Sequence, residues 1–352
     1  MTYHPLDMHA LRLNCETFPA SEAEVQSLSA AGIQVSYQEA LDSPLSRTLL
    51  SSIDALLVVS AKVKRDVIDQ LDRCQVIVRY GSGTDNVDVE RATERGIVVA
   101  NVPDFCLSEV ADHTMALLLA ATRKLRLMDQ HTRSGLWQAR VQERVRRIAG
   151  KTLGLVGFGS TAQQVARRAT AFDLIVVAYD PFFDHERARS LGVREIGFED
   201  VLHQADFVSL HAPLTPRTHH MIGEKQLRQM KSESILINAA RGGLVDEAAL
   251  VRALSEGWIT GAGIDVYESL PMFDLHPVYV RHPLFDLDNV VLTPHSAGCS
   301  IESLEQLMLD GAREAITVLN GRRPHNWVNP TVTPRVPFHG IEAQSDSEEI
   351  HG

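Results

Sequence analysis

The sequence has no long apolar run. Its longest apolar-rich stretch, residues 115–122, is far shorter than the roughly 20 residues that a membrane-spanning helix needs. The first residues lack a basic segment followed by an apolar one, so we expect no signal peptide. Together these absences predict a cytoplasmic protein with no membrane partner.

Cysteine and basic charge are also scarce. Four cysteines occur among 352 residues, far apart and without a CxxC pair, which is typical of reduced thiols rather than disulfides. The 34 basic residues are outnumbered by 45 acidic ones, and the net charge of −11 argues against nucleic acid as a partner. The length suggests about two domains. The four thiols are Cys15, Cys74, Cys106 and Cys299.

Short apolar segments of strand character alternate with helical segments through most of the chain. This alternation predicts an α/β fold in which parallel sheets are covered by helices. The first hundred residues contain no glycine fingerprint, so we do not expect the cofactor there. The predicted strands are 11–15, 33–37, 55–59, 76–80 and 97–101, followed by 153–156, 174–179, 207–211, 234–238, 259–266 and 290–292.

A glycine turn at residues 157–162 (GFGSTA) lies between a predicted strand and a predicted helix. Gly157 permits a tight turn, and Gly159 lets the backbone approach a pyrophosphate at the N-terminus of the helix. The next strand ends on Asp180, whose carboxylate suits the ribose hydroxyls and would repel a 2′-phosphate. The pattern predicts an NAD site, with NAD favoured over NADP.

Polar residues follow several other predicted strands. Arg241, Asp265 and His295 each come just after a strand, where parallel α/β sheets place their chemistry. Arg79 begins a Gly-Ser-Gly loop that includes Ser82 and Gly83. This loop suits a carboxylate because it exposes backbone N–H groups, but an ordinary strand–helix turn with a surface arginine explains it equally well.

The segment 105–125 has a helical pattern that is apolar on more than one face. Such a helix is expected to be buried at a domain or subunit contact, and we therefore predict a homodimer. The segment 125–147 that follows is rich in arginine. A nucleic-acid patch is one interpretation, but a solvated helical face is favoured because the whole chain is acidic.

Several motifs together resemble the D-isomer-specific 2-hydroxyacid dehydrogenases over roughly residues 40 to 330. They are RGGLVDE at 241–247, DVY at 265–267 and TPHSAG at 293–298, in addition to the glycine turn and the segment 79–88. Within this family, segments 77–86 and 218–221 look most like the C-terminal binding protein branch, which includes NAD-dependent corepressors.

The resemblance implies a Rossmann-type, doubly wound parallel sheet and a smaller, flavodoxin-like α/β substrate domain. The substrate domain would be discontinuous, formed by residues 1–122 and 300–330. The NAD-binding domain would cover residues 123–299. The acidic tail, 331–352, is expected to be disordered.

The resemblance also implies an NAD-dependent oxidoreductase that transfers a hydride between the nicotinamide and a small D-2-hydroxy or 2-keto acid. Arg241 would hold the substrate carboxylate and His295 would exchange the proton, roles that suit a guanidinium fork and an imidazole. Arg79, Ser82 and Gly83 would contact the substrate. The implied cofactor contacts are Gly157, Gly159, Ser160, Thr161, Asp180, Ala212, Pro213, Thr218, Ala239, Ala240, Arg241, Asp265, His295 and Gly298, with Ser82 also at such a position.

One family position differs. The family motif places a glutamate, the partner of the catalytic histidine, where this chain has Leu270. Formate dehydrogenases of the family carry a glutamine there, so turnover does not strictly require the carboxylate. An alternative interpretation is an NAD-binding regulatory or assembly protein with weak or no turnover.

The loop that follows, 272–283, could supply a replacement partner for His295. Asp274, His276 and His282 lie in it, and Glu268 precedes it, although an ordinary surface loop is the favoured interpretation. We expect no metal site from these histidines and the His219–His220 pair, because their spacing matches no common ligand pattern.

Overall fold

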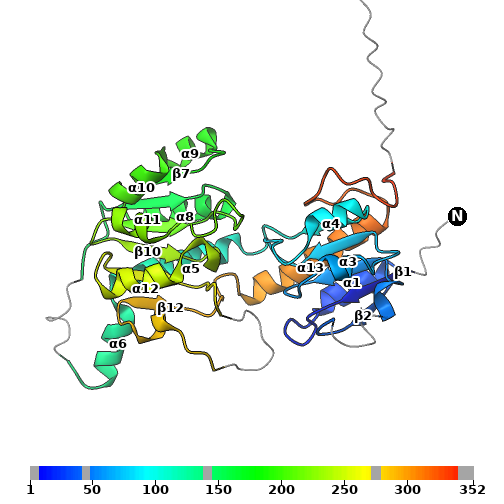
Figure 1. The fold of residues 1–352 in the computed structure, drawn as a ribbon, viewed down its shortest axis with the longest axis horizontal. Coiled ribbons are helices and arrows are strands. Elements are labelled where there is room, and N and C mark those ends of the chain that lie inside the picture. The colour runs from blue at the N-terminus through cyan, green and yellow to red at the C-terminus, as the bar shows by residue number, and fades with distance from the viewer. Residues whose placement is uncertain (1–7, 42–47, 138–144, 271–278, 340–352) are drawn as a thin grey trace, which may run out of the picture. The chain divides into compact units, whose positions relative to one another are not determined.

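We describe a computed structural model of the chain, covering residues 8–41, 48–137, 145–270 and 279–339 (Figure 1). The chain divides into two compact units. The first unit comprises Met1–Phe105 and Leu304–Gly352, and the second unit comprises Cys106–Ser303. The first unit is therefore built from two separate parts of the sequence.

The first unit contains a parallel five-stranded sheet in the order β2-β1-β3-β4-β5, which is the flavodoxin-like order. Along β3, Ala55 and Leu57 face one apolar cluster while Leu56 and Val58 face another, so both faces of the sheet are buried. Helices α1 and α13 cover one face, and α3 and α4 cover the other. The elements are β1 (Met8–Arg12), α1 (Glu22–Ala30), β2 (Ile33–Tyr37), β3 (Ala55–Val58), α3 (Arg65–Ile68), β4 (Val76–Arg79), α4 (Val89–Glu94), β5 (Val98–Asn101) and α13 (Ile301–Leu319).

The second unit contains a parallel seven-stranded sheet in the order β12-β11-β10-β9-β6-β7-β8. The order reverses at β6, as in a doubly wound Rossmann sheet. Its first strands are β6 (Thr152–Val156), β7 (Ile175–Tyr179), β8 (Arg194–Glu195) and β9 (Phe207–Leu210), and the others are β10 (Ile235–Asn238), β11 (Gly261–Ile264) and β12 (Val290–Leu292). The predicted fold class is confirmed.

Helices cover both faces of this second sheet. On one face lie α5 (Leu107–Thr122), α8 (Ser160–Ala171) and α9 (His185–Leu191). On the other lie α10 (Phe198–Gln204), α11 (Glu224–Gln229) and α12 (Glu247–Ser255). Short 3-10 turns occur at η2 (Gly242–Leu244) and η3 (Pro283–Asp286), and α6 (Leu125–Arg133) follows α5.

The unit boundary falls earlier in the chain than we expected from the sequence. We placed residues 1–122 in the first domain, but α5 packs against α8, β10 and β11 and so belongs to the second unit. Leu117 of α5 lies so close to Gly263 of β11 that a Cβ there would be 2.9 Å from the leucine Cβ. Most of the apolar residues of α5 are thus buried within its own unit, so its apolar pattern alone does not require a dimer.

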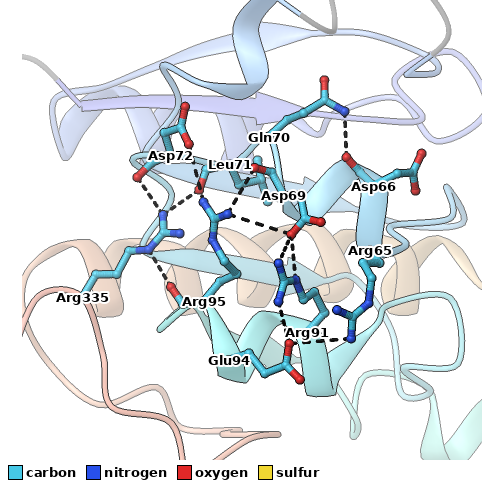
Figure 2. Close-up of polar contacts among 10 residues, drawn as sticks. All are labelled: Arg65, Asp66, Asp69, Gln70, Leu71, Asp72, Arg91, Glu94, Arg95 and Arg335. Atoms are coloured by element: carbon cyan, nitrogen blue, oxygen red, sulfur yellow. Dashed lines mark hydrogen bonds and ion pairs between the residues drawn. The ribbon is translucent and has the colours of Figure 1, made fainter.

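The segment 331–339, expected to belong to a disordered tail, packs on the first unit. Val332 and Phe338 are buried in its core. Arg335 donates hydrogen bonds to the carbonyl oxygens of Arg95 and Leu71 (2.7 Å each) and Asp72 (2.9 Å), as Figure 2 shows. We expected disorder because the tail as a whole is polar and acidic. Val332 and Phe338 are six positions apart and form no periodic apolar pattern that would have indicated packing. The rest of the tail, 340–352, lies outside the described residues.

The arginine-rich segment has the solvated character that we favoured. Helix α6 has no buried residue, and Arg126 pairs with Asp288 at 2.8 Å while Arg133 pairs with Asp129 at 2.7 Å. Arg146 pairs with Glu233. Residues 138–144 of this segment lie outside the described part. No helix among the described residues is long and apolar enough to cross a membrane.

Candidate active site

The predicted site residues of the second unit lie at one edge of its sheet. All seven strands are parallel, so their carboxyl ends share that edge. Asp180 follows β7, Arg241 follows β10, and Asp265 and His295 follow β11 and β12. Contacts between neighbouring loops connect this edge from β7 to β12.

The glycine turn joins β6 to α8 and lies against the end of β9. Gly157 has φ +95°, and a Cβ there would be 2.7 Å from the carbonyl carbon of His211, so neither the backbone nor the space admits a side chain. Gly159 is the N-cap of α8, and a Cβ there would meet open space. Ala162 is fully buried, as expected for a position that needs a small side chain. Ser160 and Thr161 form the first turn of α8.

Asp180 is tied to this turn through its carboxylate. Its Oδ2 accepts a hydrogen bond from the Phe158 N–H at 2.7 Å, and its Oδ1 accepts one from the Phe182 N–H at 2.8 Å. A carboxylate has about four acceptor positions, so both oxygens retain capacity for ribose hydroxyls. The open space at Gly159, the helix N-terminus and this anchored carboxylate together fit NAD.

The loop after β9 is a compact turn. The Thr218 hydroxyl donates to the Pro213 carbonyl oxygen at 2.6 Å and accepts from the Thr215 N–H at 2.8 Å, so it shapes the turn that carries Ala212 and Pro213. Before the turn, burial lowers the pKa of His211 to about 4. Its ring lies 2.9 Å from the Ser209 hydroxyl, and it therefore enters the loop as a neutral side chain.

The loop after β10 carries Ala239, Ala240 and Arg241. Asn238 braces it, because its side chain accepts from the Ala240 N–H at 3.1 Å and donates to the Arg241 carbonyl at 2.9 Å. Arg241 Nη1 donates to the Ala240 carbonyl at 2.7 Å. The loop then lies directly on the one after β11, since a Cβ at Gly242 would be 2.0 Å from the Tyr267 carbonyl carbon.

Asp265 is the fully buried centre of the edge. Its carboxylate accepts hydrogen bonds from the Thr293 hydroxyl (2.6 Å) and the N–H groups of Ser296 (2.9 Å) and Ala297 (3.0 Å). The imidazole of His113, on α5, lies 3.5 Å from it. Burial alone would raise the pKa of Asp265, but these donors outweigh burial and lower it to about 2. The residue is therefore charged at neutral pH.

His295 is fixed through its backbone. Its N–H donates to the Asp265 carbonyl at 2.7 Å, and its φ of +54° is unusual for a residue other than glycine. Asp265 thus holds both His295 and the two N–H groups that follow it. Beyond them, Gly298 faces the Cys106 thiol, where a Cβ would be 3.1 Å from Sγ.

The predicted substrate residues Arg79, Ser82 and Gly83 belong to the first unit, at the end of β4 and in the loop after it. Arg79 Nη1 donates to the Tyr80 carbonyl at 2.9 Å, which holds the guanidinium directly over Gly81. The Ser82 carbonyl accepts from the Asn101 side chain at 2.7 Å. The Gly-Ser-Gly loop is therefore anchored to β5, with a guanidinium at its start.

Glu268, a candidate replacement partner for His295, is in hydrogen-bond contact with two other histidines. Its carboxylate lies 3.0 Å from His219 Nε2 and 2.8 Å from His220 Nε2. His282, another candidate, lies 3.2 Å from the Glu247 carboxylate. Asp274 and His276 fall outside the described residues.

Three residues of this edge were given no individual role in the sequence analysis. His113 is one polar position in an apolar helix, and Thr293 precedes the Pro-His motif. Glu247 accepts from the Glu268 N–H at 2.7 Å and binds the Ser269 hydroxyl. His113 alone carried a usable signal, since a histidine within an apolar pattern commonly faces a buried acceptor.

Comparison with known proteins bears directly on this edge. Residues 115–297 match the family model described as D-isomer specific 2-hydroxyacid dehydrogenase, NAD binding domain. The matched region contains the glycine turn, Asp180, Arg241, Asp265 and His295. The chain belongs to this family. The predicted NAD cofactor and oxidoreductase class are confirmed, and the protein is a D-2-hydroxyacid dehydrogenase.

Two similar proteins are named for different reactions. This chain is 42% identical over 287 residues to the glyoxylate reductase of Thermococcus kodakarensis, covering 80% of this chain and 84% of that protein. It is 41% identical over 290 residues to the D-3-phosphoglycerate dehydrogenase of Methanocaldococcus jannaschii, covering 82% of this chain. The chain spans about half, 53%, of the length of that second relative.

The solved structures agree with the fold. A glyoxylate reductase from Paecilomyes thermophila superposes with a TM-score of 0.82 at 28% identity, covering 92% of this chain and 98% of that one. The shared fold includes both parallel sheets. The likeness of segments 77–86 and 218–221 to the C-terminal binding protein branch stays a prediction, because these three relatives carry the names of enzymes.

Proposed function

We propose that this dehydrogenase reduces a small 2-keto acid with NADH, using Arg241 and His295 as its catalytic residues. The observation that carries the proposal is the buried, charged Asp265, which fixes the backbone of His295 on the same sheet edge as the braced Arg241 loop. Charge and rigidity concentrated at one sheet edge are expected of a site that must hold reacting groups in place.

Each side chain has a defined task in this proposal. The bound NADH supplies the hydride for the carbonyl carbon of the keto acid. Arg241 pairs with the substrate carboxylate through its planar fork, and the protonated His295 delivers a proton to the carbonyl oxygen. Asp265 keeps His295 in place through the hydrogen bond between their backbones.

The position of Asp180 supports a proposal on which of the two nucleotides, NADH or NADPH, the protein prefers. A 2′-phosphate would meet the anchored Asp180 carboxylate, so we expect NADH to bind much more tightly than NADPH. Fluorescence titration of both nucleotides tests this, and Asp180→Ala should narrow the difference. Equal affinities in the unmodified protein would contradict the role given to Asp180.

The substrate is proposed as a small 2-keto acid such as glyoxylate, because glyoxylate reductases align with most of this chain. Arg79 could also pair with a second anionic group on a larger substrate, as in a phosphorylated acid. A steady-state screen of glyoxylate, pyruvate and hydroxypyruvate with NADH, and of D-3-phosphoglycerate with NAD, tests the choice. An Arg79→Ala variant should lose activity only toward a substrate with a second negative charge.

One observation favours a second function. Leu270 takes the place of the histidine's usual glutamate partner, and Glu268 is held by His219 and His220. An NAD-binding regulatory protein of the same fold would bind NADH and turn over none of the acids in the screen. That result would replace the enzymatic proposal.

We also propose a homodimer in the cytoplasm, now on a different surface. Helix α6 and the residues after it expose Leu125, Leu136 and Trp137, the last with 81% of its surface accessible. Burying such side chains against a second copy would be favourable. Light scattering should give about twice 38.9 kDa, and Trp137→Ser should reduce that mass. A monomer in the unmodified protein would contradict the proposal.

A further inference from the structure

Two loops at the carboxyl edge of the second sheet bring two histidines and one carboxylate together. His219 Nε2 lies 3.0 Å from Glu268 Oε1, and His220 Nε2 lies 2.9 Å from Oε1 and 2.8 Å from Oε2. The two imidazole rings are stacked, with centroids 3.9 Å apart and planes 24° apart. Neither histidine nor Glu268 has a task in the proposed hydride transfer.

The backbone is arranged so that both rings point the same way. Consecutive side chains of an extended segment point to opposite sides, but His220 has φ +51° in the left-handed region. This conformation is strained for a residue with a Cβ. The His220 N–H donates to the Gly243 carbonyl at 2.8 Å, and the Ile222 N–H donates to the Leu244 carbonyl at 3.0 Å, which fixes the turn.

Glu268 is fixed from the other side. Its N–H donates to the Glu247 carboxylate at 2.7 Å, so the backbone that carries the third group is anchored to the start of α12. The two loops are thus held independently of the contact between their side chains. The three groups converge because of their backbones, which is the condition for a preformed binding site.

We propose that His219, His220 and Glu268 bind a divalent transition-metal cation such as Zn²⁺. Two imidazole nitrogens and one carboxylate oxygen form a donor set that suits Zn²⁺. The three ligand atoms lie within 4.8 Å of one another. Tetrahedral Zn²⁺ with bonds of about 2.0–2.1 Å needs ligand atoms about 3.3 Å apart. The two histidine–glutamate separations of 3.0 and 2.8 Å therefore require only slight widening.

The site is open to solvent on one side. The side chains of His219, His220 and Glu268 are 49%, 37% and 34% exposed, which leaves an entry path and room for water as a fourth ligand. A bound cation would join the loop after β9 to the loop after β11. His219 also borders Gly243, two residues from Arg241, with its Cδ2 3.5 Å from where a Cβ of that glycine would be. The cation would therefore restrain the loop that carries Arg241.

Calorimetric titration of Zn²⁺ into chelator-treated full-length protein tests the proposal without any need for turnover. We expect one site that saturates in the micromolar range, weaker binding at lower pH and release of protons on binding, because imidazole must be unprotonated to ligate. His219→Ala, His220→Asn and Glu268→Gln should each weaken binding at least about tenfold. Asn is chosen at position 220 because it tolerates the left-handed backbone.

Two control variants separate this site from other ligands on the surface. His185→Asn removes an exposed histidine that lies 3.4 Å from the Glu195 carboxylate, and Cys299→Ser removes an exposed thiol. Both should bind Zn²⁺ like the unmodified protein. Absence of saturable binding would overturn the proposal and leave a histidine–glutamate hydrogen-bonded cluster. Binding that survives in both His219→Ala and Glu268→Gln would overturn it as well.

Discussion

Two of the buried carboxylates, one in each unit, are stabilised in different ways. In the first unit Glu24 is paired with the guanidinium of Arg12 at 3.0 Å, both side chains are fully buried, and the Tyr80 hydroxyl donates to the same oxygen at 2.9 Å. In the second unit Asp265 is held by a hydroxyl, two backbone N–H groups and an imidazole. The first arrangement neutralises a charge within a core, and the second keeps a charge at a strand end.

This difference indicates distinct roles for the two groups. The Arg12–Glu24 pair joins β1 to α1 and, through Tyr80, to the strand end before the Gly-Ser-Gly loop. It therefore supports the fold of the first unit. Asp265 joins α5, β11 and β12 and fixes His295, so it supports the site. Removing a partner should cost stability in the first case and change pH dependence in the second.

The largest expected effect comes from breaking the buried ion pair. Arg12→Met leaves Glu24 buried without its cation, and we expect a loss of about 3–5 kcal/mol in the free energy of unfolding. Urea denaturation measures it. The double variant Arg12→Met with Glu24→Leu serves as the control and should recover most of the loss, since both charges are then gone. If the double variant is as unstable as Arg12→Met, the loss in the single variant does not come from the unpaired Glu24 carboxylate.

A smaller effect is expected from Asp265→Asn, and it should depend on pH. The folded-state pKa of Asp265 is lowered to about 2 from 3.8, so its stabilisation is full above pH 4 and is lost as the pH falls towards 2. The unmodified protein should thus lose about 1 kcal/mol more than the variant between pH 6 and pH 3. Paired unfolding curves at the two pH values check this. Parallel losses would mean that Asp265 is not the titrating group.

The last effect is a shift of a pH profile and concerns the missing partner of His295. A carboxylate at position 270 would favour the protonated imidazole, and keto-acid reduction needs that form. In Leu270→Glu the fall of the reductive rate at high pH should therefore move up by about one pH unit. Leu270→Gln, which adds a polar group without charge, is the control and should leave the profile nearly unchanged. If the glutamate profile overlays that of the unmodified protein, another group already partners His295.

Much of the fold followed from local pattern. Buried strands such as β3 and β10 are continuous apolar runs, and Gly157 and Asp180 stand where the nucleotide motif requires them. β8 escaped because its two residues, Arg194 and Glu195, are exposed and carry no apolar signal. The extent of α5 was well predicted. The surface that buries α5 was not predicted, because an apolar helix has the same pattern whether a sheet or a second subunit buries it.

The site was less accessible to sequence reasoning than the fold. The common edge of Arg241, Asp265 and His295 was predicted because each follows a strand and parallel strand ends share an edge; their catalytic roles stay predictions. The partners of Glu268 could not be found, since His219 is 49 residues away and the contact depends on the left-handed turn at His220. The role of His113 needed the packing of α5 on β11 and β12, which no local pattern encodes.

The central claim is that His295 delivers the proton in an NADH-dependent reduction at the edge organised by Asp265. The most direct measurement is the rate of NADH oxidation with the best keto acid for the unmodified protein and for His295→Asn, with NADH affinity measured on both. Asn is chosen because it tolerates the backbone conformation at φ +54°. We predict a fall in kcat of about 10²–10⁴-fold with nearly unchanged NADH binding. A variant that keeps the full rate would contradict the account.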